Sequence, residues 1–105
     1  MEVKENILID KSIEFAARII KLQRYLVKDK KESVISKQIV RCGTSIGANI
    51  NEANYGQSNE TEYWLRLLVK SELLTNEEGE SLLKDCLEIK RVLISSIKTA
   101  KKNNN

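Results

Sequence analysis

Hydrophobic side chains in the first part of the chain recur every three or four residues, the spacing of one face of an α-helix. The pattern predicts a helix over residues 10–27 that begins at Asp10, a residue type favoured at helix N-caps. The polar run over residues 28–32 ends the periodicity and predicts a short connection. The predicted core stripe consists of Phe15, Ile19, Leu22 and Leu26, widened by Ala16 and Ile20.

The second stretch has the most regular period, with alternating steps of four and three residues. It predicts a helix over residues 33–54. Gly43 and Gly47 lie four residues apart inside it, and each costs a helix about 1 kcal/mol relative to alanine. We expect the helix to continue through both, with a neighbouring helix close enough to offset the cost; the alternative is a break at Gly43. The predicted core stripe is Ile35, Ile39, Cys42, Ile46, Asn49 and Ala53.

Two further helices are predicted after a turn signal at residues 54–58. The third covers residues 59–74, with Asn59 and Glu62 spaced as a capping pair at its start. Its apolar face is expected to contain Tyr63, Trp64, Leu67, Leu68 and Leu74.

The fourth predicted helix covers residues 76–101 and follows a capping box formed by Thr75 and Glu78. Basic residues at its end suit the helix dipole. Its predicted core stripe is Leu82, Cys86, Ile89, Leu93, Ile97 and Ala100.

The composition supports four helices in one domain. A chain of 105 residues supplies one hydrophobic core. It has no proline and only four glycines, so it lacks the turn residues that an all-β domain would need. We therefore predict an all-α, up-down-up-down four-helix bundle, with residues 1–105 as a single domain.

Charge is distributed unevenly along the chain. Residues 1–51 carry ten basic and six acidic side chains, residues 52–88 three and nine, and residues 89–105 five and none. Within the first segment, basic residues at helical spacing continue into the first connection. The members of this basic ladder are Arg18, Lys21, Arg24, Lys28, Lys30, Lys31 and Lys37.

Three interpretations of the basic ladder are open. It can contact the phosphates of RNA or DNA through charge, without reading their sequence. It can instead meet the acidic segment over residues 72–88 of a neighbouring subunit. It can also be partly neutralised within the molecule, because the turns near residues 28–37 and 75–80 share one end of such a bundle.

No residue pattern in the chain indicates an enzyme. There is no histidine, which removes the commonest general base and metal ligand, and we expect no catalytic residue, metal or cofactor. Cys42 and Cys86 fall on core stripes and are expected to be buried, inert thiols. Two pairs of neighbouring glutamates are expected to lie in the first turns of helices, where the dipole favours negative charge, and not to act as acid–base pairs. These are Glu60, Glu62, Glu77 and Glu78.

Core packing is the expected role of Tyr63 and Trp64, although aromatic rings can also stack on bases. A close helix crossing is favoured over an anion-binding nest at Gly43 and Gly47. No apolar run reaches the ~20 residues that span a bilayer, and the N-terminus lacks a signal-peptide core. We therefore expect a cytoplasmic protein with reduced thiols and no membrane partner.

Several stretches resemble one family. Residues 41–53, Arg-Cys-Gly-Thr-Ser-Ile-Gly-Ala-Asn-Ile-Asn-Glu-Ala, resemble the second-helix signature of the four-helix-bundle proteins called 23S rRNA intervening-sequence proteins. Residues 60–68, Glu-Thr-Glu-Tyr-Trp-Leu-Arg-Leu-Leu, resemble that family's third-helix signature. Residues 11–16 and 82–86 are also similar, so the resemblance covers nearly the whole chain.

The resemblance implies an all-α bundle without known catalysis and without agreed binding residues. Some members are encoded within insertions of ribosomal RNA genes. Relatives include the accessory protein of diversity-generating retroelements, a basic pentamer that associates with a reverse transcriptase and nucleic acid. By this resemblance the chain is expected to form a homo-oligomer, a pentamer, with RNA, DNA or a reverse transcriptase as a partner.

The third helix departs from the family pattern. In the family about four helical turns, ~15 residues, separate the Gly-Gln-Ser turn from the Glu-Thr-x-Tyr-Trp motif, whereas here Glu60 nearly follows Ser58. A shortened third helix would leave part of the core stripe uncovered. Three alternatives are open: another chain covers the exposed part of the core stripe, the helices shift their register, or the second helix bends at its glycines.

Two function hypotheses follow. The first is a non-enzymatic, self-associating bundle that binds nucleic acid or a nucleoprotein partner through the basic ladder. The second is an oligomeric assembly or accessory protein whose charges serve protein–protein contacts, for example with a reverse transcriptase, without binding nucleic acid directly.

Overall fold

Four helices make up the part of the chain that the computed structural model describes, residues 2–48 and 55–103, with side chains described over 7–48 and 55–96. No strand occurs within these ranges. Each helix contacts the next along the chain, and the last contacts the first. The helices are α1 (Glu2–Lys28), α2 (Val34–Ser45), α3 (Gly56–Lys70) and α4 (Asn76–Asn103). The predicted all-α, up-down-up-down bundle is therefore confirmed.

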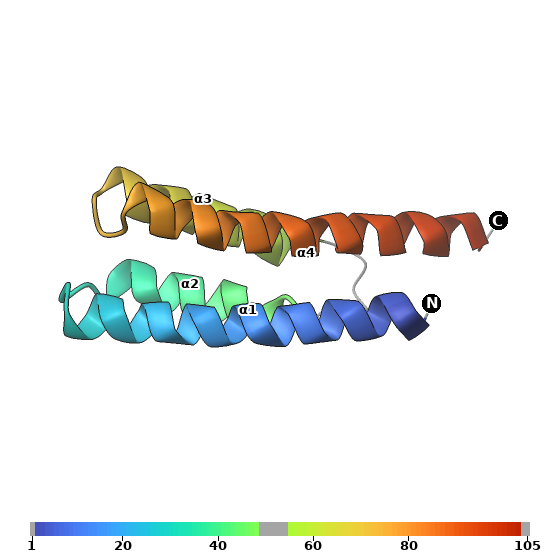
Figure 1. Ribbon diagram of the computed structural model, residues 1–105, viewed down its shortest axis with the longest axis horizontal. Helices are drawn as coiled ribbons and strands as arrows, with labels where there is room; N and C mark the ends of the chain where they lie inside the picture. The colour runs from blue at the N-terminus through green and yellow to red at the C-terminus, as the bar shows by residue number, and fades with distance from the viewer. Residues whose placement is uncertain (1, 49–54, 104–105) are drawn as a thin grey trace.

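The bundle is elongated, with extents of 50 × 20 × 19 Å. The α1–α2 and α3–α4 turns lie at one end, and both chain termini lie at the other (Figure 1). The α1 and α4 helices have 27 and 28 residues, whereas α3 has 15. The third helix is thus short, as predicted, and the long helices α1 and α4 extend past it (Figure 1).

The α1 helix begins at Glu2 and not at the predicted N-cap Asp10. The helix is longer than predicted because its core face continues toward the N-terminus through the buried Ser12 and Leu8.

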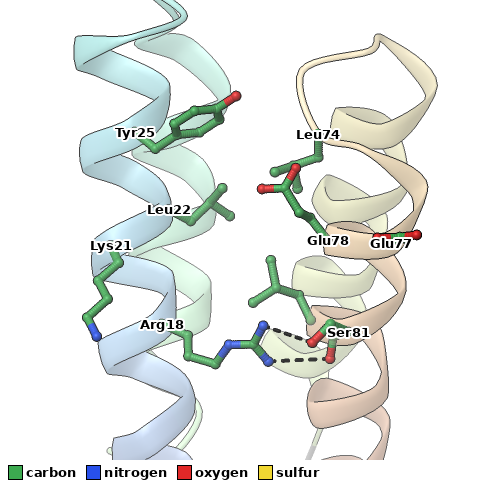
Figure 2. Close-up of a pocket in the computed structure, with 9 residues that line it drawn as sticks. Arg18, Lys21, Leu22, Tyr25, Leu74, Glu77, Glu78 and Ser81 are labelled. Atoms are coloured by element: carbon green, nitrogen blue, oxygen red, sulfur yellow. Dashed lines mark hydrogen bonds between the residues drawn. The ribbon is translucent and has the colours of Figure 1, made fainter.

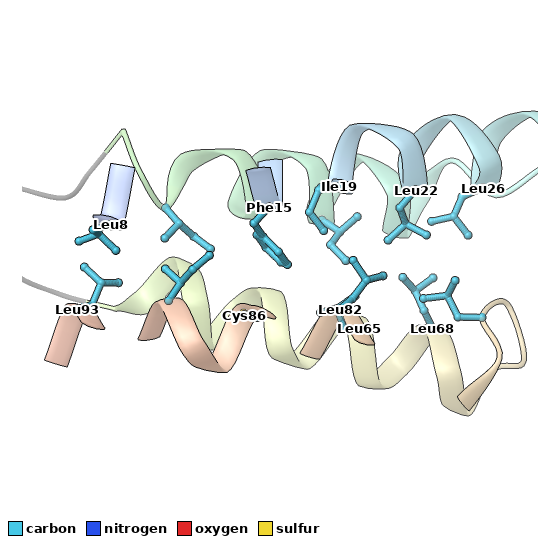
Figure 3. Close-up of a cluster of buried hydrophobic side chains, with 14 residues drawn as sticks. Leu8, Phe15, Ile19, Leu22, Leu26, Leu65, Leu68, Leu82, Cys86 and Leu93 are labelled. Atoms are coloured by element: carbon cyan, nitrogen blue, oxygen red, sulfur yellow. The ribbon is translucent and has the colours of Figure 1, made fainter. Parts of the chain in front are cut away.

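The core stripes of α1 and α4 lie where the periodicity places them. Phe15 and Ile19 on α1, and Cys86 and Ile89 on α4, are almost completely buried. Side chains from the four helices point toward one another along the bundle axis (Figure 3). Ile20 was expected to widen the α1 stripe, but it is 40% exposed. The predicted core positions Ile97 and Ala100 lie outside the residues whose side chains are described.

The second helix is shorter than predicted. It ends at Ser45, and residues 46–48 form a turn that contains Gly47. The hydroxyls of Thr44 and Ser45 donate to the carbonyls of residues 40 and 41, a local bond that competes with the helix. Together with the low helix propensity of glycine, this explains why the apolar period alone was misleading. The predicted continuation over 49–54 lies outside the described residues.

Small residues of α2 let it approach α1 closely. A Cβ added to Gly43 would lie 3.0 Å from Cγ1 of Ile19, and one added to Gly47 would lie 2.7 Å from Cβ of Ser12. The second distance is shorter than carbon atoms tolerate. The expected close helix crossing is therefore present at Gly43, and the close approach to α1 continues at Gly47 in the turn that follows α2.

The apolar face of α3 differs from the prediction. The buried positions are Ser58, Thr61, Leu65 and Leu68, whereas Tyr63 is 59% exposed. The helix also begins at Gly56, inside the predicted turn, and Asn59 donates its backbone N–H to the carbonyl of residue 55 instead of capping. Leu68 and Leu74 of the predicted face are buried, although Leu74 lies beyond the end of α3 at Lys70. Two of the four buried positions within α3 are polar, so a search for apolar residues missed them.

The predicted capping box of α4 is confirmed. The Thr75 hydroxyl accepts a 3.1 Å bond from the Glu78 backbone N–H, and the Glu78 carboxylate accepts from the Thr75 hydroxyl at 2.8 Å. At α2, by contrast, Ser33 makes no side-chain capping bond. The Glu32 carboxylate accepts the N–H groups of residues 34, 35 and 36 at 2.8–2.9 Å.

Candidate nucleic-acid interface

Six of the seven residues of the basic ladder project into solvent from one end of the bundle. Lys21, Arg24 and Lys28 follow one another along the outer face of α1 at steps of three and four residues. Lys30 and Lys31 lie in the α1–α2 turn, and Lys37 lies on α2. We call these six residues the basic surface: Lys21, Arg24, Lys28, Lys30, Lys31 and Lys37.

Arg18 is separate from the basic surface because α4 holds it. Its guanidinium forms an ion pair with Asp85. It also donates to the backbone carbonyl of Ser81 at 3.4 Å and to the Ser81 hydroxyl at 3.0 Å (Figure 2). A guanidinium with three acceptors in the molecule is poorly available to a phosphate. This partial intramolecular neutralisation joins the middle of α1 to α4, and no ion pair among the described side chains joins the two turns where the sequence placed it.

The α1–α2 turn fixes how the lysines are presented. The backbone N–H groups of Asp29 and Glu32 donate to the carbonyls of residues 25 and 26, each at 2.9 Å, and so close the end of α1. Lys31 has a φ of 56°, the left-handed conformation that reverses the chain. Because this turn is ordered by its backbone, the ammonium groups of Lys28, Lys30 and Lys31 are not needed to hold it.

Tyr25 lies between the basic residues and was not singled out by the sequence. The Lys30 Nζ lies 5.9 Å from the centre of its ring, within cation–π range. Tyr25 also lines two shallow grooves, one of about 620 Å³ between α1 and α4 and one of about 450 Å³ between the two turns. The sequence could have identified Tyr25, because it is an aromatic residue four positions after Lys21 and three before Lys28 on the same predicted helix.

The wall of the larger groove opposite α1 is acidic. Glu77 and Glu78 line the groove from α4, and Lys21 and Leu22 line it from α1 (Figure 2). Both glutamates lie in the first turn of α4, as predicted, where the helix dipole favours negative charge. This end of the bundle is therefore basic on its α1–α2 side and acidic on its α3–α4 side.

The other two glutamates do not have the predicted role. Glu60 and Glu62 lie beyond the first turn of α3. The Glu60 carboxylate accepts from the Arg41 guanidinium and from the Trp64 indole N–H at 3.2 Å, and Glu62 pairs with Lys90 at 3.2 Å. They are ion-pair partners that connect α3 to its two neighbours.

Tyr63 and Trp64 form a second surface feature, on α3. Their rings meet edge to face with centroids 5.0 Å apart. Trp64 is half-buried and packs against the core, as expected, but Tyr63 projects into solvent. Arg41 on α2, whose partner Glu60 also accepts from the Trp64 indole, is already paired. Arg66, three residues after Tyr63 on α3, is exposed, so the aromatic pair has one basic side chain beside it on its own helix, whereas the basic surface has six.

The two thiols are buried and free, as predicted. Burial raises the pKa of Cys86 to about 12 and also raises the pKa of Cys42. Both therefore carry the protonated, unreactive form at neutral pH. Within the described side chains, no group of three or more candidate ligands is placed to hold a metal ion. Over the same residues, no helix combines the length and the apolar content needed to cross a membrane.

Comparison with known proteins adds two findings. The family model described as "23S rRNA-intervening sequence protein" matches residues 4–60. A crystal structure of a protein with unknown function from the S23 ribosomal protein family, from Bacteroides thetaiotaomicron VPI-5482, is similar in fold and in sequence. It has a TM-score of 0.88 and 48% identity, and the match covers 90% of this chain and 98% of that chain. No curated protein matches significantly.

Proposed function

The chain belongs to the 23S rRNA-intervening sequence protein family, and from that premise we propose that it is a non-enzymatic, self-associating bundle that binds nucleic acid phosphates through its basic surface. The nucleic acid is RNA or DNA, either free or within a nucleoprotein partner. The proposal includes a cytoplasmic location, where nucleic acids and nucleoproteins are found.

The observation that carries the proposal is the lack of carboxylate partners for the basic surface among the described side chains. Among the described side chains, no ion pair involves any of its six members, whereas Lys11, Arg18, Arg41 and Lys90 each have one. Repulsion among like charges on an exposed surface destabilises the fold slightly. An external polyanion would remove that repulsion and release its own counterions.

The chemistry of the surface favours binding without sequence selection. Its polar groups are five ammonium groups and one guanidinium, which contact phosphates as charges. Tyr25 adds one aromatic ring, half covered by the molecule. We therefore expect RNA and DNA of different sequences to bind with similar affinity.

A salt titration of oligonucleotide binding tests the proposal. Fluorescence anisotropy would give the affinity of labelled single- and double-stranded RNA and DNA from ~50 to ~200 mM salt, where contact with several phosphates predicts a steep fall. Three exposed lysines of the surface, Lys28, Lys31 and Lys37, would be replaced by glutamine together. The matched control replaces Arg66, Lys84 and Arg91, which are equally exposed but lie on α3 and α4.

The expected result separates the two triple variants. The basic-surface variant should lose about 2 to 3 from the slope of log affinity against log salt, because each phosphate contact contributes about 0.7 to 0.9. The control should stay near the wild-type slope. An absence of binding at ~50 mM salt, or an equal loss in both variants, would contradict the proposal.

A second candidate is an assembly or accessory protein whose surfaces serve protein–protein contacts, for example with a reverse transcriptase. The observation that favours it is a set of exposed isoleucines on α1, among them Ile9, Ile13 and Ile20. A chain that self-associates but binds no oligonucleotide at low salt would support this candidate over the first. Light scattering over a range of concentrations measures the association.

A further inference from the structure

Tyr25 places an aromatic ring within the segment of the basic surface, between Lys21 and Lys28 on α1. Its side chain is half-buried, so part of it packs against the core and part is open to solvent. Its backbone carbonyl accepts the N–H groups of Asp29 and Lys30, at 2.9 and 3.4 Å. The residue that carries the ring therefore also helps to fix the turn that carries the lysines.

The ring borders the groove of about 450 Å³ between the two turns. We call it the turn groove, formed by Tyr25 and Lys30 on one side and by Lys70, Leu73 and Leu74 on the other. Its volume falls within the range of about 300 to 1,000 Å³ that is typical of ligand sites. The Lys30 Nζ lies 5.9 Å from the centre of the ring, near the outer limit of a cation–π contact. A base stacked on the ring is a closer contact, and Lys30 can then reach the phosphate beside that base.

Charge favours an anion in the turn groove. Two lysines line it, Lys30 from the α1–α2 turn and Lys70 from the end of α3, against one carboxylate, that of Glu72. Both lysines are exposed, and neither forms an ion pair among the described side chains. With Leu73 and Leu74, the groove combines an aromatic ring, apolar side chains and an excess of positive charge.

The larger groove beside Tyr25 lacks this excess. Glu77 and Glu78 line it from α4, and Lys21 lines it from α1 (Figure 2). Its other basic group, Arg18, is held by Asp85. A phosphate in the larger groove would therefore meet more negative than available positive charge, so the two grooves that share Tyr25 are not equivalent.

We propose that Tyr25 and the turn groove bind one unstacked base of a single-stranded nucleic acid, with Lys30 and Lys70 on the adjoining phosphates. This inference rests on the proposed function and names its substrate class. Every base has a π-face, so stacking adds a preference for single strands without adding a preference for sequence. In a duplex the bases are paired and stacked on one another, and a base reaches the ring only after it leaves the stack, which costs energy.

An abasic strand tests the inference, because it keeps the phosphates and lacks the bases. Fluorescence anisotropy would compare a labelled single strand, an abasic strand of the same length and a duplex. Wild type should bind the single strand at least ~5-fold more tightly than the abasic strand, the low end of the effect of one stacked base. Equal affinity of wild type for the two strands would overturn the inference.

Two substitutions of Tyr25 separate its ring from its packing. Tyr25→Leu keeps an apolar side chain against the core and should bind the single strand at least ~5-fold less tightly, with the abasic strand and the duplex unaffected. Tyr25→Phe keeps the ring and should bind like wild type, and circular dichroism should show unchanged helix content in both variants. A loss for all three ligands in Tyr25→Leu would indicate a purely structural role and overturn the inference.

The matched control for the ring is Tyr63→Leu on α3. Tyr63 is 59% exposed, so it is the more accessible ring, but it lies outside the basic surface. Tyr63→Leu should leave the affinity for all three ligands unchanged. A loss equal to that of Tyr25→Leu would contradict the assignment of the base to Tyr25.

Lys70 gives a second test that leaves the core untouched. Lys70→Gln should lower the slope of log affinity against log salt by about 0.7, the contribution of one single-strand phosphate. The control is Arg66→Gln, one turn earlier on the same helix, which is also exposed but does not line the turn groove. An unchanged slope in Lys70→Gln would contradict the placement of a phosphate in this groove.

The inference and the proposed function fail in distinguishable ways. An absence of oligonucleotide binding contradicts both. Binding that depends on Lys28, Lys31 and Lys37, but is equally tight for the abasic strand, contradicts only the inference. Salt separates the two effects, because stacking releases no counterions: Tyr25→Leu should lower the affinity by a similar factor at every salt concentration, whereas the lysine variants change the slope.

Discussion

Two turns at the same end of the bundle share a backbone design but differ in charge (Figure 1). We call residues 28–37 the basic turn and residues 71–78 the acidic turn. Each reverses the chain through a non-glycine residue in the left-handed region, Lys31 with φ 56° and Glu72 with φ 63°. In each, a glutamate side chain then helps to cap the next helix, Glu32 at α2 and Glu78 at α4.

The turns differ in what their remaining charges do. In the acidic turn, Glu77 adds charge where the α4 dipole favours it, so the negative residues suit the local structure. In the basic turn, the two lysines after the helix, Lys30 and Lys31, have no carboxylate partner among the described side chains. Local structure therefore accounts for Glu77 and Glu78, and for Lys28 in the last turn of α1, but not for Lys30 and Lys31, which we propose meet an external partner. The predictions that follow test this difference.

The largest effect on stability is expected from Glu32→Ala. Its carboxylate accepts three backbone N–H groups of a helix that has only 12 described residues. Loss of these charge-assisted bonds should lower the free energy of unfolding by about 2 kcal/mol, measured by urea denaturation. The control is Asp29→Ala in the same turn, which is exposed. Equal losses in the two variants would contradict the capping role.

Thr75→Ala should cost about 1 kcal/mol, because the acidic turn caps its helix through one hydroxyl and one carboxylate. The double variant Thr75→Ala with Glu78→Ala should cost less than the sum of the two single changes, since both belong to one cap. Glu77→Ala serves as the control and should cost clearly less. Additive costs in the double variant would show that the two side chains act independently.

Glycine at the two left-handed positions should stabilise the fold by about 0.5 kcal/mol in each case. Removing the Cβ relieves about 1 to 2 kcal/mol of local strain, and the greater freedom of glycine in the unfolded chain offsets most of it. Lys31→Gly and Glu72→Gly should be alike in urea denaturation. Only Lys31→Gly should weaken oligonucleotide binding, and an equal loss from Glu72→Gly would remove the distinction between the turns.

The smallest expected effect is a gain of about twofold in oligonucleotide affinity for Glu77→Gln at low salt, because the change removes a negative charge at the end of the bundle that we propose binds phosphates. The gain should disappear at high salt, because dissolved ions screen the interaction between the Glu77 carboxylate and the phosphates of the oligonucleotide. Anisotropy at two salt concentrations measures it. A gain that persists at high salt would indicate a cause other than charge.

The sequence predicted the long helices better than the short ones. On α1 the stripe from Phe15 to Leu26, and on α4 the stripe from Leu82 to Leu93 and the Thr75–Glu78 box, are predicted correctly, because they use the residue types that sequence rules expect. The predicted start of α1 at Asp10 is wrong, since that residue lies inside the helix.

On α3, Ser58 and Thr61 are buried and polar, and Thr61 satisfies itself by donating to the carbonyl of residue 57 at 2.6 Å. Because Thr61 is polar and forms its hydrogen bond within its own helix, hydrophobic periodicity cannot identify it as a core position.

The basic surface was predictable as a charge pattern but not as a geometry. Helical spacing grouped Arg18 with Lys21, although Arg18 faces Asp85 on α4. That contact joins residues 67 positions apart, so it depends on how the bundle closes. The same limit applies to Ile20, whose exposure depends on where α2 lies rather than on the period of α1.

The most direct test of the central claim is an amide NMR titration of the chain with a short single-stranded oligonucleotide. The account predicts that chemical-shift changes concentrate on residues 21–37, the segment of the basic surface, and that residues 71–78 of the acidic turn change less. Changes concentrated around Tyr63 and Trp64 on α3, or an absence of changes at low salt, would contradict the assignment of the basic surface.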